Sequence, residues 1–191
     1  MDVIVKIDGD GQMDPALIPT LVAPVVGHFA DYAKGNRFFD IESVRPIPFW
    51  RRVGNAALSF LSKLSSGYWQ VFDPTNGYTA IDARVAAALP LDKIRKRFFF
   101  ESDMLFRLGT IRAVVTDVPM PAIYGDETSN LSVGRAVPEF FLRHTQNLAK
   151  RLIYDYFVRD FSIASLELIT GFVFLAFGTV FGTSRWIQSV S

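Results

Sequence analysis

The sequence has no cysteine and only two histidines in 191 residues. The lack of cysteine excludes a disulfide framework, a thiolate nucleophile and a cysteine-based metal site. Neither sign of charge dominates, because 20 Lys and Arg stand against 19 Asp and Glu. A broad nucleic-acid-binding surface is therefore disfavoured. Catalysis must use carboxylates, hydroxyls, basic side chains or an oxygen-bound metal, and we assign no role to His28 and His144.

No signal sequence opens the chain, because residues 1–14 carry four acidic side chains and no long apolar run. Such a run comes at residues 161–184, where Glu167 is the only charge. A helix of this length reaches about 36 Å, which exceeds the roughly 30 Å of a bilayer's hydrocarbon core. The pattern predicts a transmembrane helix; the alternative is a buried core helix, which is usually shorter.

The segment before this run predicts an amphipathic helix from Pro138 to about Asp160. Its basic residues can lie against anionic lipid headgroups; they are Arg143, Lys150, Arg151 and Arg159. The expected organisation is a globular part at 1–134, a juxtamembrane helix at 135–160 and a membrane span at 161–184. The bias of basic residues toward the cytoplasmic side places the globular part in the cytoplasm at the cell membrane.

The order of strands and helices in the globular part predicts an α/β fold. Residues 3–7 form a β-branched run that predicts a central strand, followed by a helix at 15–29 and a strand at 30–38. Further segments follow in order: helix 50–66, a turn at 73–77 and a short strand, helix 82–89, helix 103–109 and strand 111–118.

The clearest motif is residues 6–15, Lys-Ile-Asp-Gly-Asp-Gly-Gln-Met-Asp-Pro. Asp8 and Asp10 stand two residues apart at a strand end, where both carboxylates can reach one hard cation. Oxygen ligands favour Mg²⁺ or Mn²⁺. An EF-hand is excluded, because Met13 stands where that loop needs glycine and Pro19 where it needs glutamate. An acidic turn without a ligand is the remaining alternative.

A strand that ends in Asp-x-Asp-x-Gln before a proline resembles the motif of family 2 glycosyltransferases, most closely the dolichyl-phosphate mannose synthase branch. The likeness extends to residues 32–38, Tyr-Ala-Lys-Gly-Asn-Arg-Phe, and to the Asp-Pro-x-x-Gly turn within 73–78. It implies a partial GT-A-like, Rossmann-like fold. It also implies that a divalent cation is bound by Asp8, Asp10 and Gln12, and that Arg37 contacts the phosphates of the sugar nucleotide.

Two further groups complete the candidate site. Arg51 and Arg52 precede a helix and can hold the donor or a lipid phosphate, or form a solvated surface pair. Glu101 and Asp103 resemble the family's acidic pair near the acceptor, with Asp103 as the expected base; capping of a helix is the alternative. A base is unnecessary if the acceptor is a phosphate, which is already an anion.

The resemblance implies an inverting transferase of a sugar from a nucleotide sugar to a membrane-associated acceptor, for which a polyprenyl phosphate is a candidate. Asn130 departs from the lysine of the polyprenyl-phosphate branch, which weakens this choice of acceptor. Two rivals remain: a non-catalytic membrane-tethered remnant and a metal-dependent phosphohydrolase. A homo-oligomer stays open. The family carries further strands before the Asp-x-Asp loop, so we expect an N-terminally truncated enzyme that cannot act alone.

Overall fold

The computed structural model describes residues 2–9, 11–39, 49–121 and 133–190, apart from the side chains of 50, 51 and 133–136. The chain divides into two compact units, Met1–Arg151 and Leu152–Ser191. We call the first the α/β unit and the second the C-terminal unit.

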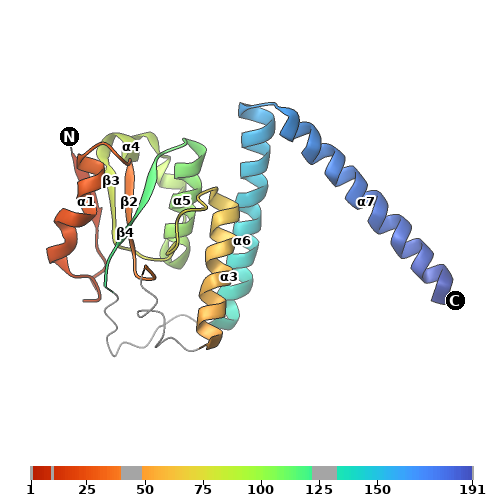
Figure 1. Ribbon diagram of the computed structural model, residues 1–191, viewed down its shortest axis with the longest axis horizontal. Helices are drawn as coiled ribbons and strands as arrows, with labels where there is room; N and C mark the ends of the chain where they lie inside the picture. The colour runs from red at the N-terminus through yellow and green to blue at the C-terminus, as the bar shows by residue number, and fades with distance from the viewer. Residues whose placement is uncertain (1, 10, 40–48, 122–132, 191) are drawn as a thin grey trace. The chain divides into compact units, whose positions relative to one another are not determined.

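The α/β unit is built on a four-stranded mixed sheet (Figure 1). Its strands are β1 (Val3–Lys6), β2 (Tyr32–Asn36), β3 (Thr79–Asp82) and β4 (Val115–Pro119), and their order is β1-β3-β2-β4. The pair β2·β4 is parallel, whereas β3 runs antiparallel to both β1 and β2. The prediction of an α/β fold is confirmed.

The prediction that the first strand is central is wrong for the described sheet, because β1 lies at its edge and pairs only with β3. Its β-branched residues are accounted for by burial on one face. Val3 and Val5 pack with the core cluster that contains Leu21 and Val25 of α1. Ile4 points to the other face and is 52% exposed.

Helices cover both faces of the sheet. On one face lies α1 (Ile18–Val26), which follows a 3-10 turn capped by Asp14. On the other lie α4 (Ala83–Ala88) and α5 (Phe100–Thr110), whose Leu105 and Leu108 join a second apolar cluster. The predicted helix 15–29 ends early, because Gly27 closes α1 and His28 adopts a left-handed backbone with φ of 59°.

Two longer helices pack beyond α5. They are α3 (Phe49–Ser66) and α6 (Val133–Ile153), and they lie side by side (Figure 1). Gly109 of α5 lies so close to the Ser66 carbonyl that a Cβ would overlap it. Pro138 lies inside α6 rather than at its start. The α/β unit therefore includes most of the helix that the sequence assigned to a juxtamembrane segment.

His144 joins α6 to α3. Its Nδ1 lies 2.8 Å from the Ser65 Oγ, and the residue is 1% exposed. Burial lowers the pKa of His144 to about 4. The group is therefore neutral in the folded protein at pH values where it is charged in the unfolded chain.

This depressed pKa predicts that acid destabilises the α/β unit. The contribution of neutral His144 is fully present above about pH 6.5 and is lost as pH falls toward 4, by on the order of 2 to 3 kcal/mol. Chemical unfolding in detergent across this range measures the slope. His144→Gln should flatten it, whatever its effect on absolute stability; an unchanged slope would show that His144 is not the group responsible.

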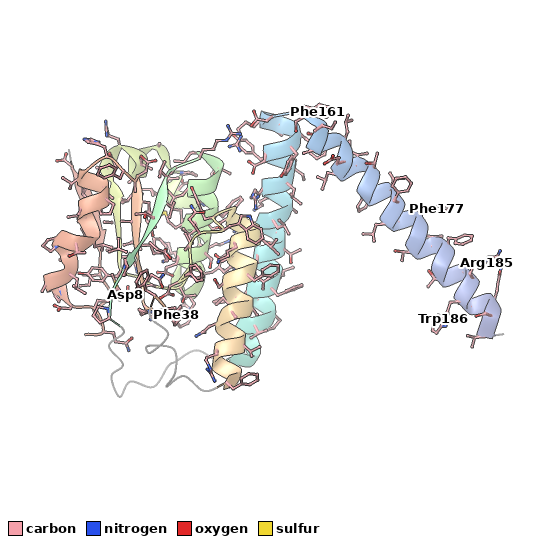
Figure 2. The ribbon with its side chains drawn as sticks, viewed as in Figure 1. Asp8, Phe38, Phe161, Phe177, Arg185 and Trp186 are labelled. Carbon is pink, nitrogen blue, oxygen red and sulfur yellow. The ribbon has the colours of Figure 1, made fainter. Side chains whose placement is uncertain are left out.

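The C-terminal unit contains a π-helical turn (Tyr154–Arg159) and α7 (Ile163–Val190). Ser165 links them, because its Oγ donates to the Tyr156 carbonyl at 2.5 Å. The 28 residues of α7 include an 18-residue window with a mean hydropathy of 1.9, of which 6% is buried (Figure 2). Among the described residues, α7 is the helix that is long enough and apolar enough to cross a membrane. This agrees with the predicted span.

Candidate functional site

A cavity of about 820 Å³ brings together Lys6, Asp8 and Glu101. Asp8, labelled in Figure 2, follows the end of β1, and Glu101 lies in the first turn of α5. The Lys6 Nζ lies 2.7 Å from the Asp8 Oδ1 and 3.1 Å from the Glu101 Oε1. The two predicted carboxylates therefore meet around one ammonium group.

Lys6 was missed as a functional residue, although it belongs to the quoted motif. Burial alone would lower its pKa, but the hydrogen bond to Asp8 and the charge of Glu101 outweigh this and raise the pKa. The ring of Phe100 adds a cation–π contact at 5.6 Å. The signal was available, because Lys6 and Asp8 are two residues apart and side chains at that spacing share one side of an extended chain.

Gly77 forms the wall beside Asp8. A Cβ at this position would overlap the Asp8 Oδ2 and would stand 2.8 Å from the Lys6 Nζ. Only glycine therefore lets the turn of residues 73–78 lie this close to the carboxylate. The sequence assigns Gly77 mainly to the turn, and the structure shows that it also lies against the Asp8 carboxylate.

The donor set around Asp8 has the chemistry that Mg²⁺ or Mn²⁺ prefers, because carboxylate and amide oxygens are hard ligands. Gln12 follows in the same loop and is half-buried, while Asp10 lies outside the described residues. Among the residues that are described, no group of three or more carboxylate or imidazole side chains is gathered for a metal. The Asp8 Oδ2 fills the position that a Cβ of residue 77 would take, and the carboxylate is presented to the cavity of about 820 Å³.

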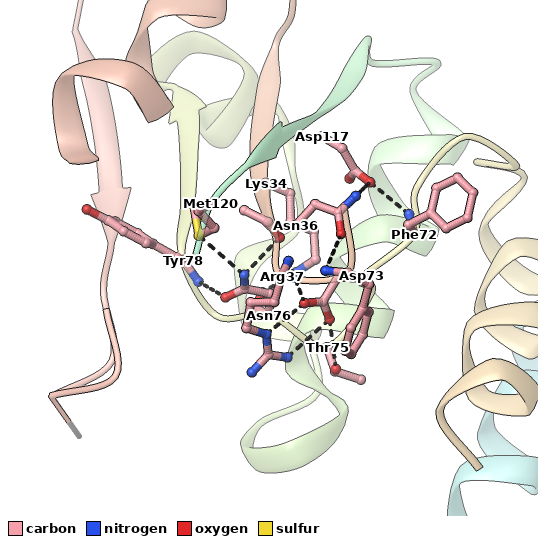
Figure 3. Close-up of polar contacts among 12 residues, drawn as sticks. Lys34, Asn36, Arg37, Phe72, Asp73, Thr75, Asn76, Tyr78, Asp117 and Met120 are labelled. Atoms are coloured by element: carbon pink, nitrogen blue, oxygen red, sulfur yellow. Dashed lines mark hydrogen bonds and ion pairs between the residues drawn. The ribbon is translucent and has the colours of Figure 1, made fainter. Parts of the chain in front are cut away.

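Arg37 is held by Asp73 (Figure 3). Its Nε donates to the Asp73 Oδ2 at 2.7 Å and its Nη2 to the Oδ1 at 3.1 Å. Asp73 is fully buried and also accepts from the Thr75 hydroxyl at 3.1 Å. Such a two-point contact fixes the plane of the guanidinium, which is a useful arrangement for a phosphate contact.

A buried polar network supports this pair from β2 and β4 (Figure 3). Lys34 donates to the Asn76 carbonyl, and the Asn76 Nδ2 donates to the Gly35 carbonyl at 2.8 Å. The Asn36 Nδ2 donates to Asp117 at 3.1 Å. Together these contacts attach the turn of residues 73–78 to the sheet.

Burial shifts both charged groups of the network. It lowers the pKa of Lys34 to about 8, against the opposing charges of Asp73 and Glu101. It raises the pKa of Asp117 to about 6. Neither residue was singled out from the sequence, because alternation along a strand indicates burial but not which polar group will share it.

Arg52 lies at a second cavity of about 390 Å³, together with Phe38 and Lys63. Asn55 lines both this cavity and the one that contains Asp8, so the two are neighbours. The side chain of Arg51 and the segment with Asn130 lie outside the described residues.

Asp103 is placed apart from Asp8. Its Oδ1 accepts from the Asn147 Nδ2 at 3.0 Å, and its Oδ2 accepts from the Arg95 backbone N–H at 2.9 Å and from the Arg107 Nε at 3.1 Å. It is 2% exposed and does not line the cavity of Lys6, Asp8 and Glu101. In the structure Asp103 joins α5 to α6, and Glu101 alone of the acidic pair lines that cavity.

The sequence is similar to those of known sugar transferases. No family model matches the sequence. The chain is 28% identical over 123 residues to UDP-N-acetylglucosamine–dolichyl-phosphate N-acetylglucosaminyltransferase of Methanococcus voltae, covering 64% of this chain and 49% of that protein. It is 31% identical over 120 residues to undecaprenyl-phosphate mannosyltransferase of Micrococcus luteus, covering 62% and 48%.

A third relative is an uncharacterized protein of Methanocaldococcus jannaschii, which is 29% identical over 122 residues, or 64% of this chain and 50% of that protein. The chain thus spans about half the length of the curated relatives it matches. The two relatives with named activities are both glycosyltransferases that act on a polyprenyl phosphate. This agrees with the resemblance drawn from the residues, without deciding the branch.

Proposed function

We propose that this chain forms part of a membrane-bound glycosyltransferase that moves a sugar from a nucleotide sugar to a polyprenyl phosphate. The observation that carries the proposal is the meeting of Asp8 and Glu101 around Lys6 in one cavity, in a chain similar to polyprenyl-phosphate sugar transferases. We further propose that the sheet belongs to a GT-A-like fold of family 2. The α/β unit lies on the cytoplasmic side, with α7 in the bilayer.

The reaction joins an oxygen of the acceptor phosphate to the anomeric carbon of the sugar. The bond from that carbon to the diphosphate oxygen breaks, and the nucleoside diphosphate leaves with the electron pair. Attack opposite the leaving group inverts the anomeric centre. The acceptor oxygen is already an anion, so no proton has to be removed.

The residues of the site have distinct roles in this scheme. Asp8, Asp10 and Gln12 would hold Mg²⁺ or Mn²⁺, which when bound neutralises charge on the leaving diphosphate. Lys6 supplies a further fixed positive charge at the cavity. The guanidinium of Arg37 is oriented by Asp73 and can bind a phosphate oxygen. Arg52 offers a second cation at the neighbouring cavity.

The proposal is tested by product analysis. Membranes that contain the chain, or a longer protein that includes it, are incubated with Mn²⁺, a polyprenyl phosphate and radiolabelled uridine or guanosine sugar nucleotides, and the lipids are separated by chromatography. A labelled lipid that forms with Mn²⁺ and not with EDTA supports the transferase. Absence of product with every donor would favour a non-catalytic form, and release of free phosphate would favour a phosphohydrolase.

The two acidic residues of α5 should respond differently to loss of charge. Asp103→Asn is expected to lower the free energy of unfolding by about 1 to 3 kcal/mol, because it weakens the charge-assisted contacts that join α5 to α6. Glu101→Gln should leave the unfolding temperature nearly unchanged and lower the transfer rate instead, since Lys6 loses one of its partners. Thermal unfolding and initial rates of both variants measure this.

The reverse pattern, with Asp103→Asn stable and inactive, would support Asp103 as the base expected from the sequence. The comparison is matched, because both substitutions exchange a carboxylate for the amide of the same shape.

A further inference from the structure

A third cavity in the α/β unit is lined mainly by cationic side chains. It encloses about 440 Å³ between residues 92–96, α5 and α6, and it shares no residue with the cavity of Asp8 and Glu101. Two carboxylates line it, Asp92 and Asp103. Against them stand six cationic side chains, which are Lys93, Arg95, Lys96, Arg107, Arg143 and Lys150. We call this cavity the basic pocket.

Two of the guanidinium groups are fixed before any ligand binds. Arg107 donates from Nε to the buried Asp103 at 3.1 Å and from Nη2 to the Lys93 carbonyl at 2.6 Å, and its side chain is 16% exposed. Arg143 pairs with Glu139 and lies over the Phe99 ring at 5.5 Å. Because their orientation is set by these contacts, little side-chain entropy remains to be lost on binding.

The other cations concentrate positive charge that their neighbours do not neutralise. Within the part of the chain that the structure describes, no ion pair forms on four of them: Lys93, Arg95, Lys96 and Lys150. They come from two segments distant in sequence, which converge on one polar hollow. Such a hollow attracts an anion that offers several oxygens, as a phosphate group does.

The surroundings favour a phosphate carried by a lipid. Exposed apolar side chains flank the basic segment, Leu91 at 55% and Phe98 at 58% exposure. Lys150 also precedes α7, the candidate membrane span, by only a short stretch of chain. Basic side chains between exposed apolar ones are typical of segments that bind an anionic membrane surface.

We propose that the basic pocket binds the phosphate headgroup of an anionic phospholipid. This binding does not depend on the sugar transfer proposed above, because the pocket lies outside the cavity that contains Asp8. The pocket fixes the α/β unit to a membrane rich in such lipids.

The test uses the full chain in a neutral detergent. It is titrated by calorimetry with short-chain phosphatidylglycerol, with phosphatidylcholine of the same chain length, and with inorganic phosphate. Phosphatidylglycerol should bind saturably and at least about tenfold more tightly than either of the others, because phosphatidylcholine has no net charge and inorganic phosphate has no acyl chains to contact Leu91 and Phe98. Lys96→Gln with Lys150→Gln should weaken this binding by about tenfold or more.

The matched control is Arg84→Gln with Arg112→Gln, which removes the same charge away from the pocket; it should bind phosphatidylglycerol within about twofold of the unmodified chain. Equal affinity for both lipids, or unchanged affinity in the Lys96 and Lys150 variant, would overturn the proposal. If inorganic phosphate binds as tightly as phosphatidylglycerol and is lost in that variant, the pocket serves a soluble anion and the lipid assignment is wrong.

Discussion

Replacing Asp8 with asparagine is expected to lower sugar transfer at least about a hundredfold, because a lost metal-ligand charge removes roughly 3 kcal/mol of stabilisation of the leaving diphosphate. The Asp8 side chain is 45% exposed and is paired with the partly exposed Lys6, so folding should be little affected. Initial rates with a fixed donor and polyprenyl phosphate measure the loss of transfer. Titration with Mn²⁺ by calorimetry measures the loss of metal affinity.

Asp2→Asn serves as the control for this variant, since Asp2 is an exposed carboxylate at the other end of the same strand. It should retain the rate and the Mn²⁺ affinity of the unmodified chain. A rate for Asp8→Asn close to normal would remove Asp8 from the machinery, and with it the case for metal-assisted transfer.

Replacing Asp73 with alanine should be the most destabilising of the substitutions considered. Asp73 is fully buried and accepts from Arg37 and from Thr75, so its loss leaves the guanidinium without this partner. Because Arg37 is partly exposed, at 29% of its side chain, we expect a loss of about 2 to 4 kcal/mol rather than the larger value of a fully buried pair. This corresponds to a fall of roughly 5 to 12 °C in the unfolding temperature.

A double-mutant cycle with Arg37→Met separates the ion pair from the packing of the turn. If the pair is responsible, the double variant should be more stable than Asp73→Ala alone, since the guanidinium that has lost its Asp73 partner is also removed. Asp92→Ala, at an exposed carboxylate, is the control and should change stability by less than about 0.5 kcal/mol. A similarly small effect of Asp73→Ala would contradict the role given to this pair.

Much of the fold could be predicted because local signals decide it. The helical spacing within residues 50–66 matches α3, and Asp82 begins α4 because its side chain accepts from the Arg84 N–H. The order of the strands could not be predicted in this way. Alternation shows which residues are buried, but it does not tell that β3 inserts between β1 and β2.

The candidate site, too, could be predicted only where local sequence patterns define it. The motif around Asp8 marks the cavity, but the sequence does not tell which of Glu101 and Asp103 lines it. Residues two apart in a helix point about 200° from each other, so Glu101 and Asp103 cannot both face one cavity. Asp103 accepts hydrogen bonds from the side chains of Asn147 and Arg107. Asn147 is 44 residues away in the sequence. No local pattern announces such a contact.

The order of the strands also bears on how the chain is made. Tyr32 of β2 pairs with Ile81 on one side and with Val115 on the other. Within the described sheet, β2 therefore has no partner strand on either side until β3 has been synthesised. Pairings between distant segments form slowly, and exposed apolar strands favour aggregation while they wait. A nascent chain that stalls before β4 therefore exposes one side of β2, including Ala33, to other chains.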